Sequence, residues 1–238
     1  MLLQPCVNPT PHVDSFCAQH LDQLARIEDT RFSGRLRNDQ HNLQLPRRWL
    51  EICRKYHVHE KRSLCQPSLE RSLVELRVID VVDMSVDYAP ASCEYVALSY
   101  CWGRGRNVVC TIANKGHLAK PRALEDVQLP ATVEDAITVT KATGVRYLWI
   151  DALCNIQDDP IALDKQLRQM DLIYRHSVYT IIAAGGDHAD FGLPGVRKNS
   201  RKVKSDAIVL DVITLIPTFP DSSGLGTKES IWRTRAWT

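Results

Sequence analysis

An apolar run ends at Asp151 in the stretch YLWIDALCNIQDDP, residues 147–160, and a cysteine follows three positions later. A carboxylate at the end of a strand can orient a ligand or act as a base, and a thiolate is a competent nucleophile when a nearby cation lowers its pKa. No such cation lies beside Cys154 in the sequence. We therefore interpret Cys154 as a small buried apolar residue. Asp151 is either a ligand-binding residue or an acceptor for backbone N–H groups of the next loop.

Two further carboxylates close the same stretch. Asp159 precedes Pro160, a combination typical of a helix N-cap followed by proline in the first helical position. For Asp159 this capping role is favoured over a catalytic one. Asp158 is less constrained, and with Asp151 it is a candidate catalytic carboxylate.

A glycine-rich turn with the sequence SYCWGRGR, residues 99–106, follows another apolar segment. Its backbone N–H groups and its arginines could hold a phosphate or a nucleotide. The alternative is a tight structural turn packed under the tryptophan. The candidate ligand-binding residues of this turn are Tyr100, Trp102, Gly103 and Arg104.

Four side chains with metal-binding chemistry occur in the spacing C-x3-H-x-H-x5-C, at Cys53, His57, His59 and Cys65. Zinc accepts two cysteines and two histidines. However, Cys53 and His57 share a helix face from which His59 departs, and no paired CxxC is present. We favour a basic surface helix here and expect no bound metal.

Composition excludes several classes of protein. Thirty basic against 28 acidic side chains leave a net charge of +2, so we expect neither a nucleic-acid partner nor a membrane surface. No apolar run approaches the ~20 residues of a membrane helix, and the first residues lack the features of a secretory signal. Eight cysteines then indicate reduced thiols in a cytosolic or nuclear protein. The basic run at 197–204 is interpreted as a solvated loop.

The elements that must position these residues follow from apolar periodicity. Thr132 with Asp135 has the spacing of a capping box, and Gly144 is a C-cap candidate, so both ends of one helix are marked. Strands are predicted at 73–82, 94–103, 145–151, 177–186 and 207–216, and helices at 46–59, 129–144 and 160–175.

The alternation of strands and helices over 95–184 predicts an α/β fold, a parallel sheet flanked by helices. Ligands of such sheets bind beyond the carboxyl ends of the strands. The segments that reach this edge are 99–103, 151–159 and 183–190. Residues 1–70 form a mainly helical N-terminal extension that we expect to be partly disordered.

Five motifs occur in a fixed order: YVALSYCWG, LPATVEDAI, YLWIDALCNIQDD followed by MDLIY, GLPGVR, and WRTRAWT. In order and spacing they resemble the heterokaryon incompatibility (HET) domain of filamentous fungi. The resemblance covers residues 73–238. The chain departs from the usual pattern at Asn155, where isoleucine is common, and at Gln166, where many members carry an acid.

The resemblance implies a flavodoxin-like or TIR-like sheet in a cytoplasmic protein of self/non-self recognition, a form of innate immunity. Such domains trigger growth arrest or programmed cell death when different hyphae fuse, through self-association and protein partners of the incompatibility pathway. Some TIR domains also cleave NAD with a catalytic glutamate, so NAD is a possible substrate, and no cofactor is expected.

The last motif of the family usually continues into a Gln-Glu pair, whereas this sequence ends at Thr238. The resemblance thus implies a HET domain truncated within its last motif, with any catalytic acid beyond its end. Within that motif, Arg235 is a candidate anion ligand. Two functions remain: an interaction module for cell-death signalling, which we favour, and a TIR-like NAD-cleaving enzyme.

Overall fold

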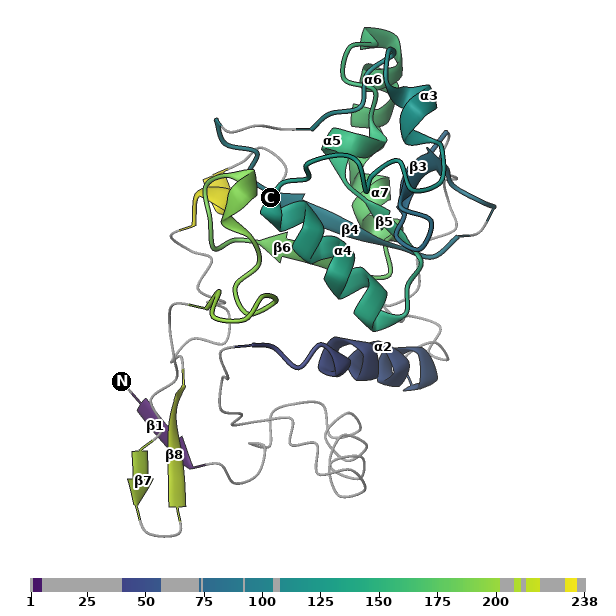
Figure 1. The fold of residues 1–238 in the computed structure, drawn as a ribbon. Helices are drawn as coiled ribbons and strands as arrows, with labels where there is room; N and C mark the ends of the chain where they lie inside the picture. Colours follow the sequence, from purple (N-terminus) through teal and green to yellow (C-terminus); the bar gives the residue numbers. More distant parts are fainter. Residues whose placement is uncertain are drawn as a thin grey trace.

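In the computed structural model of this chain, the described residues are 2–5, 40–56, 73, 75–91, 93–104, 108–201, 208–210, 213–218 and 230–234. Most of them build an α/β body around a five-stranded sheet flanked by helices, which confirms the predicted fold class (Figure 1).

The central sheet has the strand order β3-β2-β5-β4-β6. Its middle strand is β5 (Tyr147–Trp149), the compact apolar run of the sequence. β4 (Tyr95–Tyr100) runs parallel both to β5 and to β6 (Thr180–Ala183), as predicted. All six residues of β4 are buried, because β4 has a strand on each side and helices over both faces.

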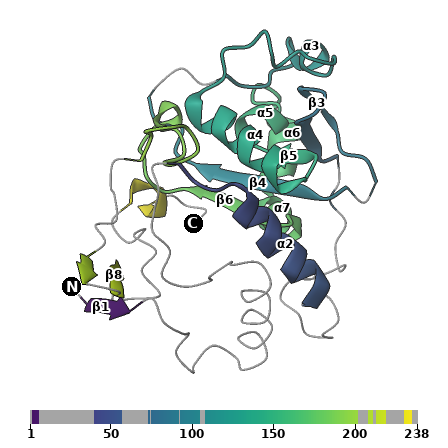
Figure 2. The ribbon, with the colours of Figure 1, turned by 60° about the horizontal axis from the view of Figure 1, so that its bottom comes forward.

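Two crossover connections supply those helices. α4 (Ala131–Thr143) joins β4 to β5, whereas α6 (Pro160–Leu167) and α7 (Met170–His176) join β5 to β6. Because β5 and β6 lie on opposite sides of β4, right-handed crossovers place α4 on one face of the sheet and α7 on the other (Figures 1 and 2).

Two aromatic contacts fix α7 to its face of the sheet. The rings of Trp149 and Tyr174 meet edge-on with their centroids 5.5 Å apart. Tyr95 donates its hydroxyl proton to the carbonyl oxygen of Ile173 at 2.6 Å. Burial raises the pKa of the Tyr95 hydroxyl, so this group stays protonated and able to donate.

Local signals predicted two helix boundaries correctly. Gly144 ends α4 in the left-handed conformation, with φ of 78°. The side chain of Asp159 accepts the N–H of Ala162 at 3.0 Å at the start of α6, directly before Pro160.

The predicted single helix over 160–175 is wrong, since α6 and α7 are separate helices. Two buried glutamines lie at the break. Gln169 donates to the side-chain oxygen of Gln166 at 3.0 Å, and Gln166 donates to the carbonyl of Glu75 at 3.1 Å. These bonds satisfy polar groups that an uninterrupted apolar helix face would leave unpaired.

The first strand is shorter than the predicted 73–82. β2 (Arg77–Asp80) turns into β3 (Ser85–Tyr88), a strand that was not predicted, and β2 is antiparallel to both β3 and β5. Arg146 closes the turn, donating to Asp80 at 2.8 Å and to Asp83 at 2.7 Å. The sheet is therefore mixed.

A second sheet has the order β1-β8-β7 and consists of antiparallel pairs. Its strands are β1 (Leu2–Pro5), β7 (Ile208–Leu210) and β8 (Ile213–Thr218). The prediction of one strand over 207–216 is wrong, because the chain reverses between Leu210 and Ile213, which pair with each other.

Helix α2 (Gln44–Tyr56) corresponds to the helix predicted at 46–59, of which residues 57–59 lie outside the described part. It lies beside α4 (Figures 1 and 2), and its Leu50 joins the core. Just before it, Gln40 donates to the carbonyl of Val196 at 3.0 Å. Among the described helices, none has the length and apolar character needed to cross a membrane.

Candidate functional site

The loops that follow β4, β5 and β6, called here the first, second and third loops, meet at one edge of the central sheet. Trp102, in the first loop, connects it to the other two. Its indole Nε1 donates to both carboxylate oxygens of Asp151, each at 3.1 Å. Its carbonyl oxygen accepts the N–H of Ala189 at 3.2 Å. Trp102 and Asp151 are both half-buried, so they form a partly accessible pair of an aromatic ring and a carboxylate.

The interpretation of Asp151 as an acceptor for a backbone N–H group is confirmed, and its ligand-binding role stays a prediction. It lies at the predicted edge, as the first residue of the short helix α5 (Asp151–Cys154). One of its carboxylate oxygens also accepts the N–H of Ala152 at 2.8 Å. The carboxylate is thus oriented by an indole and a backbone amide.

Gly103 brings the first loop into direct contact with the third. Its φ is +67°, and a Cβ placed on it would lie 2.4 Å from the Cβ of His188. Any side chain here would be strained by the backbone and would collide with its neighbour. The role of Gly103 in this structure is close packing of two loops, and His188 is the partner that the sequence did not indicate.

The other candidate ligand residues are placed differently. Tyr100 is 2% exposed, so its ring belongs to the core. Arg104 is exposed beyond Gly103. Arg235, and Arg106 (the second arginine of the 99–106 turn), lie outside the described residues.

The two acidic residues after Cys154 are already hydrogen-bonded. Asp158 accepts the backbone N–H of Ile112 at 2.7 Å, which ties this loop to the segment before α3 (Lys115–Leu118). Asp159 caps α6. Asp158 remains exposed, so its free side could still face a ligand.

Cys154 is buried, as expected for a small apolar residue. Burial raises the pKa of its thiol to about 12, with backbone hydrogen bonding and Arg77 acting weakly in the opposite direction. Its sulfur accepts the N–H of Ile150 at 3.4 Å. A protonated, enclosed thiol is not a nucleophile at neutral pH.

The candidate metal site of the first half of the chain falls largely outside the described residues. Cys53 is half-buried on α2, whereas His57, His59 and Cys65 lie outside the described part. Within the described segments, no group of three or more histidine, cysteine or acidic residues could hold a metal ion.

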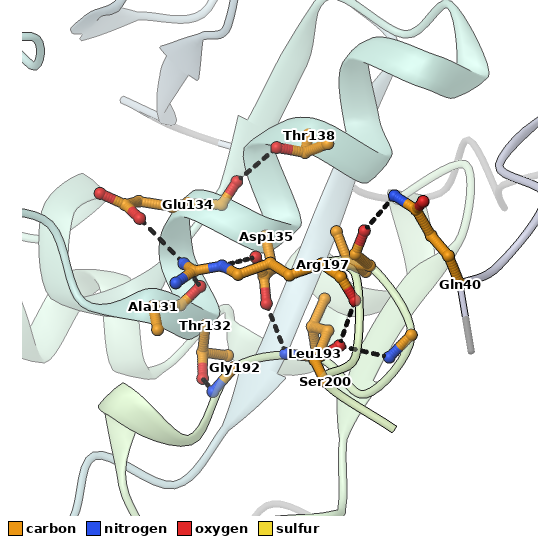
Figure 3. A network of polar contacts seen from close by, with 12 residues as sticks. Gln40, Ala131, Thr132, Glu134, Asp135, Thr138, Gly192, Leu193, Arg197 and Ser200 are labelled. Atoms are coloured by element: carbon orange, nitrogen blue, oxygen red, sulfur yellow. Dashed lines mark hydrogen bonds and ion pairs between the residues drawn. The ribbon is translucent and has the colours of Figure 1, made fainter. Parts of the chain in front are cut away.

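The third loop is anchored to α4 by a polar network that the sequence did not reveal (Figure 3). Asp135, with 3% of its side chain exposed, accepts Nε of Arg197 and the N–H of Leu193, both at 2.7 Å. Thr132 accepts the N–H of Gly192 at 3.1 Å. Arg197 also binds Glu134 at 2.9 Å.

The capping-box prediction for Thr132 and Asp135 is therefore wrong. Pro130 is the N-cap residue of α4 and makes no side-chain cap bond. Both polar side chains instead bind the segment 192–197, some 60 positions away along the chain. Arg197, interpreted as part of a solvated basic loop, is an anchor for that segment.

The last motif also lies beside this edge. Trp232, in the short helix η2 (Ile231–Thr234), donates its indole N–H to the hydroxyl of Ser99 at 2.8 Å. Ser99 is a buried residue of β4, three positions before Trp102. The resemblance implied that this motif lies next to the site, but the sequence did not indicate Ser99 as the partner of Trp232.

Comparison with known proteins identifies one family. The family model described as heterokaryon incompatibility protein (HET) matches residues 95–238, which is more than half of the chain. The match includes all three loops of the edge, α4 and η2, whereas α2, β2 and β3 precede it. Searches against curated proteins and against solved structures gave no match.

Proposed function

Because the chain belongs to the heterokaryon incompatibility (HET) family, we propose that it is a cytoplasmic signalling module of incompatibility. In this proposal the module triggers growth arrest or programmed cell death by self-association and by contacts with protein partners. Self-association and partner contacts are thus the proposed mechanism of a chain whose family is known.

One observation favours an interaction module over an enzyme. The chemically reactive groups of the edge are engaged within the protein. Asp151 accepts an indole and a backbone N–H, Asp158 accepts the N–H of Ile112, and Cys154 is enclosed as a thiol. Groups held in this way maintain loop geometry, which a surface for protein recognition requires.

The test combines association in solution with a response in cells. We expect the molar mass of the purified chain, followed by light scattering, to rise with concentration above that of a 26.9 kDa monomer. Controlled expression in fungal hyphae should arrest growth. A protein that stays monomeric at high concentration and leaves growth unchanged would overturn the proposal.

A second candidate, cleavage of NAD, is favoured by the pair of Trp102 and Asp151. A half-buried indole can stack on a base, and a neighbouring carboxylate can accept a ribose hydroxyl. The pair lies at the carboxyl edge, where α/β sheets bind nucleotides.

Nicotinamide release from NAD by the purified chain separates the two candidates. The enzyme hypothesis expects sustained turnover that Asp151→Ala abolishes. The interaction module expects no turnover in either protein. Tyr88→Ala is the matched control for general damage, because Tyr88 is exposed on β3, which lies at the opposite end of the strand order from β4 and β6.

A further inference from the structure

The two outer strands of the central sheet differ in how their outward-facing edges are protected. β3 is the last strand on one side and β6 is the last on the other. An unpaired strand edge presents backbone donors and acceptors that favour the addition of another strand, and natural sheets usually block such edges.

The β3 edge is blocked by side chains. The N–H of Tyr88 donates to the carboxylate of Asp87 at 2.7 Å, and the carbonyl of Val86 accepts Nη2 of Arg77 at 3.1 Å. Asp87 also places a charge within the strand. These are ordinary means of preventing a second strand from pairing there.

The β6 edge carries none of these features within the described part of the chain. Its sequence is Thr-Ile-Ile-Ala, without charge or proline. The N–H of Ala97 in β4 donates to the carbonyl of Tyr179, and Ala97 pairs in register with Thr180. In a parallel pair of strands, alternate residues direct their backbone groups toward the partner, so Tyr179 and every second residue after it bond to β4. The backbone groups of Thr180 and Ile182 therefore point outward, and no described strand pairs with them.

An apolar patch lies beside this edge. Ile182 is 46% exposed and pairs in register with Ser99. Trp232 binds the hydroxyl of Ser99, the register partner of Ile182, and the adjacent Ile231 is 54% exposed. A strand that is added at β6 would cover these side chains as well as satisfy the backbone.

The charges along β6 indicate which strand fits. The exposed Arg175 precedes the strand, whereas the exposed Asp187 and Asp190 follow it. Two copies of β6 placed antiparallel bring the basic end of each beside the acidic end of the other. With the two-fold axis at Ile181, Thr180 lies opposite Ile182. Arg175, at the end of α7, and Asp187, beyond the turn after β6, flank the strand at its two ends.

We propose that β6 is the edge at which a second copy of this chain adds its own β6 in antiparallel orientation. One sheet then runs through both copies, with the Ile182, Ile231 and Trp232 patches beside the junction. The inference rests on the self-association proposed above and names its surface. The outward backbone groups of Thr180 and Ile182, with which no described strand pairs, accept an added strand, and the complementary charges at the two ends of β6 favour an identical one.

Sedimentation velocity of this chain over a range of concentrations tests this surface. Ile182→Pro removes an outward N–H without breaking a bond to β4, and Ile182→Lys adds charge to the edge. We expect each to weaken association at least ~10-fold. The melting temperature should stay near that of the wild type. Tyr88→Lys, on the blocked β3 edge, is the matched control and should associate like the wild type.

Charge exchange supplies an independent measurement. Arg175→Asp and Asp187→Arg should each weaken association by roughly two- to fivefold, and the double variant should recover it. If the wild type associates and the Ile182 variants associate equally well, the β6 surface is wrong while self-association stands. If the wild type is monomeric throughout, self-association and this surface both fail. Should Ile182→Pro unfold, Ile182→Lys decides the outcome.

Discussion

The indole N–H of Trp102 is shared between the two carboxylate oxygens of Asp151, at 3.1 Å from each. The two residues are 49 positions apart and follow neighbouring parallel strands. Their meeting is a consequence of sheet geometry, since the carboxyl ends of β4 and β5 lie at the same edge. It makes Trp102 the centre of the edge, with Asp151 on one side and the third loop on the other.

Replacing Trp102 by Phe removes this donor but keeps an aromatic ring. Hydrogen bonds to charged groups contribute more than those to neutral ones, so we expect a loss of about 1–2 kcal/mol in the free energy of unfolding. Urea denaturation measures it. Trp232→Phe is the matched control, because its indole donates to the neutral hydroxyl of Ser99. An equal or larger loss for Trp232→Phe would contradict the importance of the charged acceptor.

Gly103→Ala tests the packing of the first loop on the third. The new methyl group would meet the Cβ of His188 at 2.4 Å and the carbonyl oxygen of Asp187 at 2.8 Å, at a positive φ. We expect a loss of about 2 kcal/mol or more in unfolding free energy. Gly116→Ala, in α3 with nothing near its Cβ, should be neutral or stabilising by up to about 1 kcal/mol. Similar midpoints of urea denaturation for the two variants would show that the loop contact is unimportant.

The parts of this fold that could be predicted are those encoded locally. The apolar runs of β4 and β5, the Asp159–Pro160 start of α6 and the Gly144 end of α4 each depend on a few adjacent residues. The convergence of Trp102 and Asp151 could also be predicted, because it needs only the rule for parallel strands.

The parts that could not be predicted depend on distant partners. β3 has only four residues and alternates too briefly to stand out, and it exists because β2 pairs with it. Thr132 and Asp135 have the spacing of a local cap, but their partners lie on the segment 192–197. The contact of His188 with Gly103 depends on the path of a loop, on which periodicity carries no information.

Asp135→Asn tests the anchor of that loop. The substitution keeps the size of the side chain but removes the charge that binds Arg197. Breaking a buried ion pair costs about 3–5 kcal/mol, and because Arg197 is 47% exposed and can be rehydrated, we expect about 2 kcal/mol in unfolding free energy. Limited proteolysis should also cut the 192–201 segment faster.

The matched control is Glu134→Gln, which removes the exposed arm of the same network. Its side chain is 53% exposed, so its loss should cost less than about 1 kcal/mol. If the two substitutions destabilise the protein equally, the buried carboxylate is not the main anchor.

The buried thiol of Cys154 predicts a loss of stability in alkali. Below pH 9 the thiol is protonated in the folded and unfolded chains, and its folded-state pKa is about 12. Between these values the unfolded chain releases a proton that the folded chain keeps. The unfolded state therefore gains stability as pH rises, and the free energy of unfolding falls by up to about 1.4 kcal/mol per pH unit from this group.

Cys154→Ala removes this contribution, so the variant should lose less stability than the wild type between pH 9 and 11. Urea denaturation at several pH values measures the difference, and the range from pH 6 to 8 is the internal control, because the difference between the proteins should be constant there. The raised pKa of Cys93, Tyr95 and Tyr179 adds alkaline destabilisation to both proteins and cancels in the comparison. A difference that is the same at pH 7 and pH 11 would mean that the thiol of Cys154 titrates equally in the folded and unfolded chains.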